Sequence, residues 1–181
     1  AFRLDFDVDG TDNSFIESRL VRRRLPDMST RRSLWVLEEH IATSERAARF
    51  PSQPHEPSRW RVVSSSRRNA VGQRTGYEVL GHSAVSLLAP DDPAQTRAGF
   101  TAHPLWITAY DREQLYAAGA YPTLGAGGDG LPRWSASDRP LENKDIVLWY
   151  TVGFQHVPRS EDWPVMPTMS HEFEIRPFDF F

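Results

Sequence analysis

The chain contains many short segments in which apolar and polar residues alternate, and this pattern constrains the fold more than any other feature. Phe2, Leu4, Phe6 and Val8 alternate with charged residues through positions 2–9. This is the period of a strand with one face buried. Further strand candidates are residues 14–21, 33–37, 60–63, 76–80, 105–110, 145–150 and 173–175. The pattern therefore predicts an all-β protein.

The connections between these strands are rich in turn-forming residues. Residues 9–13, DGTDN, separate the first two alternating runs and predict a β-hairpin there. Residues 44–50, SERAARF, have helical propensity over one or two turns. Fourteen prolines and eleven glycines interrupt the remaining segments, which favours a sandwich with long loops. No linker divides the 181 residues, so we expect one domain or a large part of one.

Charge and composition argue against several classes of partner. The net charge of −3 and the pI near 6.1 give no electrostatic reason to bind nucleic acid or an anionic membrane. No run of about eighteen apolar residues is present to span a bilayer. Arginines 22–24 and 31–32 form a basic patch, which we interpret as a solvated loop or an interface face. We expect neither nucleic acid nor a membrane as a partner.

The absence of cysteine limits the chemistry of the chain. With no cysteine in the sequence, disulfides and thiolate metal sites are excluded. The cellular compartment stays open, because secreted bacterial proteins can also lack cysteine. A soluble chain of this composition fits either the cytoplasm or a secreted location.

The most specific motif is residues 145–167, DIVLWYTVGFQHVPRSEDWPVMP. This block is too long and too rich in Trp, Pro and Met to arise from strand patterning alone. It resembles the copper/topaquinone primary amine oxidases. In that family the histidine of this block is the third copper ligand, remote in sequence from a His-x-His pair that supplies the other two. The resemblance therefore implies that His156 binds copper.

Weaker matches follow in the family's order at residues 1–10, 69–80, 100–110, 130–132 and 180–181. The sequence has no Asn-Tyr pair, the context in which the family makes its quinone, and no His-x-His. The resemblance thus implies that residues 1–181 are the C-terminal portion of the catalytic domain, a large antiparallel β-sandwich. Topaquinone would form on a tyrosine outside this chain, which itself would supply no catalytic residue.

The same resemblance predicts the partners. An N-terminal portion of the enzyme, either a separate chain or a missing segment, would carry the quinone tyrosine and the His-x-His pair. The assembly is expected to form a two-fold symmetric dimer that acts on a primary amine. Alone, the chain should expose the edge of its first strand.

A second metal site is predicted at the first strand. Residues i and i+2 of a strand share a face, so Asp5 and Asp7 place two carboxylates together. These like charges repel unless a hard cation that prefers oxygen ligands, such as calcium, lies between them. The resemblance adds Asp145 and the carbonyls of Phe6 and Ile146 as ligands. The alternative is a solvated polar strand face without an ion.

Other residues of the long block have structural interpretations. Trp163, in a proline-rich turn, is predicted to anchor the core through its indole. Arg159 is predicted to form a charged network with Glu161 or Asp162 that holds the histidine loop. The remaining histidines, His40, His55, His82, His103 and His171, are interpreted as ordinary surface or core residues.

Two other patterns are rejected as binding motifs. Residues 5–16 begin like an EF-hand loop, but the twelfth position is Ile16 and strands flank the segment. Residues 125–130 satisfy the G-x-G-x-x-G pattern, yet Leu131-Pro132-Arg133 follows where the helix of a dinucleotide-binding fold should begin. We interpret this glycine-rich stretch as a flexible loop.

Three functions remain open. The leading hypothesis is the C-terminal portion of a copper amine oxidase, which oxidises a primary amine to an aldehyde and releases ammonia and hydrogen peroxide. The second is a non-catalytic β-sandwich that keeps the fold, lacks the quinone and serves as a structural or binding subunit. The third is a calcium-stabilised interaction domain that binds no copper.

Overall fold

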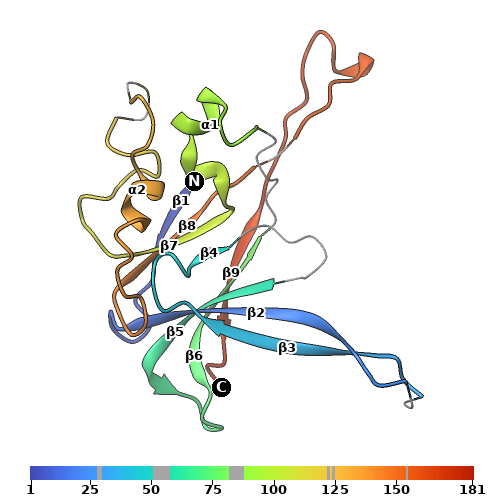
Figure 1. Cartoon of the computed structure of the whole chain (residues 1–181), viewed down its shortest axis with the longest axis vertical. Helices are drawn as coiled ribbons and strands as arrows, with labels where there is room; N and C mark the ends of the chain where they lie inside the picture. Colours follow the sequence, from blue (N-terminus) through green and yellow to red (C-terminus); the bar gives the residue numbers. More distant parts are fainter. Residues whose placement is uncertain (28–29, 51–57, 82–87, 122, 124, 154) are drawn as a thin grey trace.

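The computed structural model describes residues 1–27, 30–50, 58–81, 88–121, 123, 125–153 and 155–181, which form two antiparallel sheets that face each other (Figure 1). The four-stranded sheet has the order β1-β8-β7-β4 and the five-stranded sheet the order β3-β2-β5-β6-β9. The strands are β1 (Phe2–Asp5), β2 (Asn13–Arg24), β3 (Ser33–Ile41), β4 (Arg49–Phe50), β5 (Ser58–Arg68), β6 (Arg74–Gly81), β7 (Leu105–Ala109), β8 (Ile146–Tyr150) and β9 (Phe173–Phe178). The prediction of an all-β sandwich is confirmed.

The four-stranded sheet has β8 near its centre. β8 consists of the apolar run IVLWY, and every one of its residues is buried. It pairs with β1 on one side, where Asp5 faces Val147, and with β7 on the other. A strand with both faces covered needs no polar alternation, which explains the continuous apolar run. β1 lies at the edge of this sheet, as expected from the sequence.

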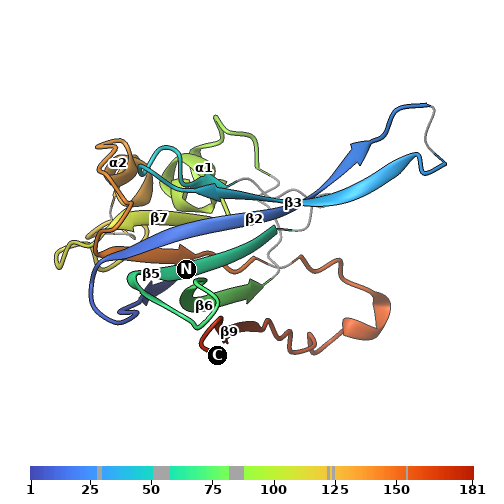
Figure 2. The same ribbon diagram turned by 90° about the horizontal axis from the view of Figure 1, so that it is seen from below.

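The five-stranded sheet contains the longest strands. β2 and β3 pair from Ile16↔Ile41 to Arg24↔Ser33, and their outer halves extend away from the rest of the sandwich (Figure 2). The basic patch lies at the tip of this hairpin. Its arginines are exposed, and three of them form ion pairs, Arg23 with Glu38 and both Arg24 and Arg32 with Asp27.

The main core fills the space between the two sheets. Phe15, Val62 and Val79 contribute from the five-stranded sheet and Ile107 and Leu148 from the four-stranded sheet, all at 1% exposure or less. Phe6 and Val8 belong to the same core and Leu4 packs against it, which confirms the predicted inward face at these positions, whereas Phe2 at the start of the run is 48% exposed. Burying such apolar side chains contributes about 1.5–3 kcal/mol each.

The described residues also form two short helices, α1 (Pro93–Arg97) and α2 (Leu131–Ser135), and two 3-10 helices, η1 (Gly99–Ala102) and η2 (Ser160–Asp162). A second apolar cluster of Trp106, Leu131, Val147 and Trp149 packs against Trp134 of α2. Hence α2 covers the face of the four-stranded sheet that points away from the main core. Within the described residues, no helix is long and apolar enough to cross a membrane.

The predicted hairpin at residues 9–13 is wrong, because the two runs that it joins belong to different sheets. β1 pairs with β8, whereas β2 pairs with β3 and β5. Asn13 stabilises the crossing between the sheets: its side-chain amide bonds the backbone of Phe6, Val8 and Gly10. Side-chain bonds of this kind compete with a regular ladder.

The predicted helix at residues 44–50 is also wrong. This segment is a turn followed by β4, which pairs with β7. Glu45 is fully buried, and its carboxylate accepts hydrogen bonds from Arg139 and from the backbone N–H of Ala109. These long-range contacts outweigh a weak local helical propensity.

The glycine-rich loop leads directly into α2, so a one-turn helix does follow it. Gly130 has φ 74° and its backbone lies so close to Ala117 that a Cβ would approach the Ala117 carbonyl oxygen to 2.1 Å. The loop therefore needs glycine for close backbone packing. No strand precedes it among the described residues from 110 to 130, unlike a dinucleotide-binding turn.

Candidate functional site

His156 lies in a segment that leaves the sandwich after β8 and returns at β9. We call residues 155–170 the His156 segment; in Figure 1 its orange-red trace extends well beyond the sheets. Most of its side chains are exposed, including Trp163 at 83%. The prediction that Trp163 anchors the core is therefore wrong in this structure. Among the described residues of the segment, His156 is half-buried and Asp162 is buried, whereas the other side chains are exposed.

His156, Arg159 and Asp162 form a compact polar cluster. The Nε2 atom of His156 lies 3.0 Å from Oδ2 of Asp162, and the Arg159 backbone N–H donates to the same oxygen at 2.9 Å. The Arg159 guanidinium lies 3.5 Å from Oδ1 of Asp162. The predicted charged network is thus present through Asp162, and Glu161 stays exposed.

The electrostatics of this cluster favour an ionised Asp162. The backbone N–H of Arg159, together with the side chains of His156 and Arg159, lowers the pKa of Asp162 below its ordinary value. An ionised carboxylate beside Nε2 favours a proton on that nitrogen. The other ring nitrogen, Nδ1, then keeps its lone pair, and a lone pair of this kind is what a metal ligand requires.

Three carboxylates meet at the opposite end of β8. Asp5, Asp7 and Asp145 offer oxygen atoms that all lie within 4.8 Å of one another, and we call these residues the acidic cluster. The pairing of β1 with β8 explains the arrangement, because the Asp5↔Val147 register, continued past the strand end, brings Asp7 opposite Asp145. Strand spacing predicted the first two as neighbours and the family resemblance added the third, and the structure brings all three together.

The acidic cluster carries unbalanced negative charge. Burial and the neighbouring charges of Asp5 and Asp7 raise the pKa of Asp145, an effect that Arg3 offsets in part. The Oδ1 atom of Asp145 is buried without a hydrogen-bond partner. Arg3 donates to Asp5 at 3.1 Å. A buried carboxylate oxygen without a donor, next to two further carboxylates, is a chemical environment that fits a hard cation.

The two carbonyl groups predicted as ligands adjoin these acids in the chain. Phe6 lies between Asp5 and Asp7, and its carbonyl oxygen accepts a bond from the Asn13 side chain at 3.4 Å. Ile146 is the first residue of β8 and pairs with Ala109 of β7. The side chains of both residues are buried.

The other histidines differ in their surroundings. His40 is exposed on β3, and His103 packs edge-on against Trp106 at 4.8 Å, where burial lowers its pKa. His55 and His82 lie outside the described residues. His171 is half-buried, and its Nε2 atom lies 3.1 Å from the Tyr150 hydroxyl. This last contact joins residues 21 positions apart and has no signal in the sequence.

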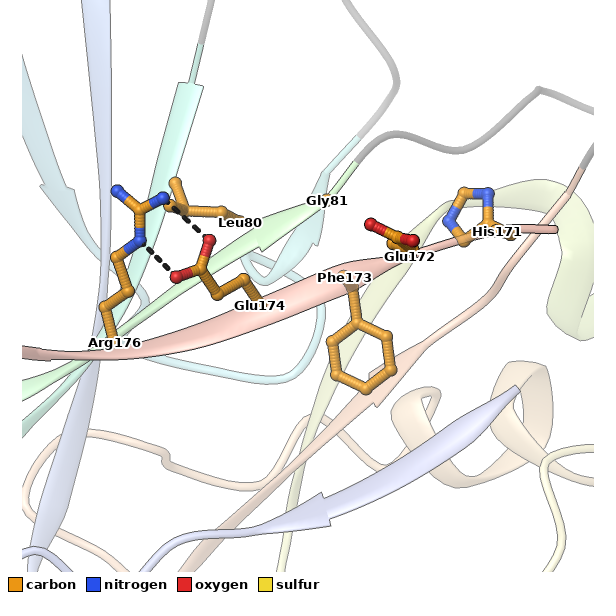
Figure 3. A pocket seen from close by; sticks show the side chains of 7 residues that line it. All are labelled: Leu80, Gly81, His171, Glu172, Phe173, Glu174 and Arg176. Carbon is orange, nitrogen blue, oxygen red and sulfur yellow. Dashed lines mark hydrogen bonds and ion pairs between the residues drawn. The ribbon is translucent and has the colours of Figure 1, made fainter.

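A cavity of about 760 Å³ adjoins His171 where β6 ends and β9 begins. Figure 3 shows His171 and Glu172 at one end of the lining and Glu174 and Arg176 at the other. The Arg176 guanidinium donates two hydrogen bonds to the Glu174 carboxylate. The hydrogen bonds and the charge of Arg176 lower the pKa of Glu174. Such an exposed pair contributes little to stability.

Comparison with known proteins identifies relatives of the whole chain. The family model described as copper amine oxidase, enzyme domain, matches residues 1–181. Two plant proteins are similar: amine oxidase [copper-containing] gamma 1 of Arabidopsis thaliana, 43% identical over 99% of the chain, and the primary amine oxidase of Pisum sativum, 41% identical over 99%. The chain spans only 26% and 27% of their lengths.

The fold has a close counterpart among solved structures. A copper-containing benzylamine oxidase from Hansenula polymorpha aligns over 99% of this chain and 28% of its own, with a TM-score of 0.87 and 27% sequence identity. The two-sheet architecture is therefore shared, and this chain corresponds to about a quarter of the larger protein.

Proposed function

Because the chain belongs to the copper amine oxidase family along its entire length, we propose that it forms the C-terminal portion of the catalytic domain of a copper-dependent primary amine oxidase. The complete protein would oxidise a primary amine to an aldehyde and release ammonia and hydrogen peroxide. The observation that carries the proposal is the match over all 181 residues together with the intact histidine block.

His156 would hold the copper ion through Nδ1. Its Nε2 atom is engaged by Asp162 at 3.0 Å, and a carboxylate on the outer nitrogen of a metal-bound imidazole fixes its tautomer and orientation. The donor suits copper, which binds imidazole nitrogen well. When bound, copper and the family's quinone would supply the redox chemistry.

The remaining copper ligands would come from other parts of the complete protein. The acidic cluster is the one group of three or more candidate ligands within the described ranges. It contains oxygen donors alone and suits calcium better than copper. The N-terminal portion would therefore supply two further histidines and the tyrosine from which topaquinone forms.

The residues around His156 would fix the tautomer and the orientation of its ring for metal binding. Asp162 holds a proton on Nε2, and the backbone N–H and guanidinium of Arg159 keep Asp162 ionised. In the neutral ring, this arrangement would leave the lone pair of Nδ1 available to the metal. Arg159 and Asp162 therefore act by positioning, since neither is proposed to touch the substrate.

The acidic cluster would bind a structural calcium ion. Asp5, Asp7 and Asp145 would be ligands, and the carbonyls of Phe6 and Ile146 would complete the oxygen shell. An ion there would join β1 to the start of β8 and stabilise the edge of the four-stranded sheet. We also propose that the complete enzyme is a two-fold symmetric dimer.

The proposal is tested on the full-length protein that contains this chain. We expect about one copper per subunit, a visible quinone absorbance that phenylhydrazine shifts, and peroxide release from benzylamine or a diamine. Protein prepared without copper is the control, and adding Cu(II) under oxygen should generate the colour. A folded full-length protein that binds no copper and forms no quinone would instead support the non-catalytic β-sandwich subunit.

A further inference from the structure

The described residues of the His156 segment make their polar contacts with one another rather than with the sandwich. Between described residues, the hydrogen bonds and ion pairs of residues 155–170 involve His156, Arg159, Ser160, Asp162 and Trp163, and they stay inside the segment. Its side chains are not part of either apolar core cluster. Within the part of the chain that the structure describes, the position of His156 relative to the sheets therefore depends on how the two ends of the segment are held.

Both ends of the segment are held next to each other. Tyr150, the last residue of β8, is fully buried, and His171 immediately precedes β9. The Tyr150 hydroxyl lies 3.1 Å from Nε2 of His171, and the Tyr150 ring packs against Phe173 at 5.3 Å. The neighbouring backbone N–H of Thr151 donates to the Pro104 carbonyl at 2.8 Å. Two residues that bracket the His156 segment are thus joined side chain to side chain.

The β6 backbone leaves just enough room for this contact. A Cβ on Gly81 would lie 2.5 Å from the Tyr150 hydroxyl oxygen and 3.2 Å from the Cβ of Phe173. The glycine therefore lets the phenol reach His171 beneath the end of β6. Burial also raises the pKa of Tyr150 to about 12, so the hydroxyl keeps its proton at neutral pH and can donate to a neutral His171.

We infer that the Tyr150–His171 hydrogen bond is a clasp that closes the base of the His156 segment and positions the copper ligand. The inference rests on the proposed role of His156. A bond at the base of a sixteen-residue segment limits the directions in which the segment can leave the sheets. It thereby reduces the conformational freedom that metal binding must otherwise remove. Tyr150 and His171 are positioning residues, since neither is proposed to bind copper.

The test uses Cu(II) and the full-length protein. Tyr150→Phe keeps the buried ring and removes the hydroxyl, His171→Ala removes the acceptor, and His171→Gln restores a side-chain amide near the Nε2 position. Glu172→Gln, on the adjacent exposed residue, is the matched control. We measure the Cu(II) dissociation constant by competition with a chelator, the Cu(II) EPR spectrum, and thermal unfolding as a check of the fold.

We expect Tyr150→Phe and His171→Ala each to weaken Cu(II) binding about 3- to 10-fold, less than the 10- to 100-fold typical when a direct partner of a ligand is lost. Both should broaden the EPR spectrum, and His171→Gln should recover affinity. The double variant should be no weaker than Tyr150→Phe alone, because that variant already lacks the bond to His171. Gly81→Ala should have the same effect on Cu(II) binding, since it displaces the hydroxyl.

Wild-type affinity and an unchanged EPR spectrum in both Tyr150→Phe and His171→Ala would overturn the clasp, as would fully additive losses in the double variant. His156→Ala separates this failure from a failure of the proposed function. If His156→Ala loses copper while the clasp variants keep it, the clasp alone is wrong. If His156→Ala also keeps copper, the ligand assignment itself is wrong.

Discussion

At the scale of single residues, the chemistry of the His156 segment depends on one carboxylate. Asp162 is 4% exposed, whereas its neighbours in the segment are exposed, and it accepts from both the Arg159 backbone and the His156 ring. A short sequence block thus contains both the proposed copper ligand and the carboxylate that contacts its ring. Because both residues lie within seven positions of the same block, the sequence alone could propose this contact before the fold is known.

Removing the imidazole of His156 should abolish the copper site without unfolding the protein. In the full-length protein, His156→Ala is expected to fold, to lose most of its copper and to show no quinone colour. Asp162→Asn should weaken copper binding about 10- to 100-fold, because the ring loses the group that orients it. Metal analysis and visible absorbance measure both effects. His40→Ala, on the exposed face of β3, is the control, and full copper and colour in His156→Ala would refute the assignment.

Removing Asp7 should affect stability more than chemistry. Asp7→Ala in the full-length protein is expected to lower calcium content and the thermal unfolding temperature, with a smaller loss in the rate of amine oxidation by the protein that stays folded. The reason is that an ion at the acidic cluster joins two strands and does not contact the reacting groups. Equal calcium content in wild type and Asp7→Ala would count against the site.

The pH dependence of stability should report the raised pKa of Asp145. Without calcium, the folded state holds the Asp145 proton to higher pH than the unfolded state, whose pKa stays near 3.8. The Asp145 contribution to the free energy of unfolding therefore falls as pH rises from below that value through the raised pKa. Added calcium should reverse the trend, because the ion favours the ionised carboxylate.

Asp145→Asn isolates this contribution from that of other carboxyl groups. The pKa values of Asp138, Asp162 and Glu174 are lowered, so their stabilising contributions are lost as pH falls. Urea unfolding in EDTA and in calcium, with wild type and Asp145→Asn compared at each pH, measures the difference. A difference that does not change with pH in EDTA would show that Asp145 titrates normally.

At the scale of elements, one buried ion pair joins two connections that the sequence separates widely. Glu45, fully buried in the turn before β4, binds Arg139 in the connection that follows α2. The backbone N–H of Arg139 donates to the same carboxylate, and that of Glu45 to the Arg139 carbonyl. This reciprocal pairing replaces the helix that local propensity predicts for residues 44–50.

Removing the charge of Glu45 should destabilise the sandwich. Glu45→Gln keeps the shape but weakens the bonds to the half-buried Arg139, and we expect a loss of about 2 kcal/mol in the free energy of unfolding, less than the 3–5 kcal/mol for breaking a fully buried pair. Glu161→Gln, on an exposed residue, is the matched control. Urea denaturation measures the loss, and stability within about 0.5 kcal/mol of wild type would contradict the structural role.

At the scale of the whole molecule, the chain exposes an edge strand and apolar side chains, two kinds of surface through which proteins associate. β1 is an edge strand, and large apolar side chains are exposed on the β2–β3 hairpin and in the His156 segment. The most exposed of these on the hairpin are Trp35 and Leu37, at 55% and 56%, and those in the segment include Trp163 and Val165, at 83% and 79%. Unpaired strand edges and grouped apolar side chains typically mark interaction surfaces.

The 181 residues expressed alone should therefore associate or aggregate, and we expect stability only together with the N-terminal portion. Light scattering and thermal unfolding of the isolated chain test this expectation, with the full-length protein as the reference. A monodisperse monomer with one sharp unfolding transition would show that the described sandwich is sufficient by itself.

The sequence alone determined the all-β class, the inward face of the first strand, and the family, because strand alternation and the histidine block are local patterns. It also singled out His156 as a candidate ligand and predicted that Arg159 pairs with a nearby acid, which the structure shows to be Asp162. The roles of His156 and of the acidic cluster as metal ligands stay predictions. Propensity failed at residues 44–50 and the predicted hairpin, where long-range contacts outweigh weak local preferences.

The tertiary structure shows how distant residues meet, including Asp145, which only the family resemblance assigns to the site of Asp5 and Asp7. Antiparallel pairing of β1 with β8 brings Asp145 to Asp5 and Asp7, and the return of the chain into β9 brings His171 to Tyr150. Neither contact follows from spacing, since each depends on the register and order of strands far apart in the sequence. Register is set by how whole strands bury their apolar faces, and that is a property of the complete sandwich rather than of any one segment.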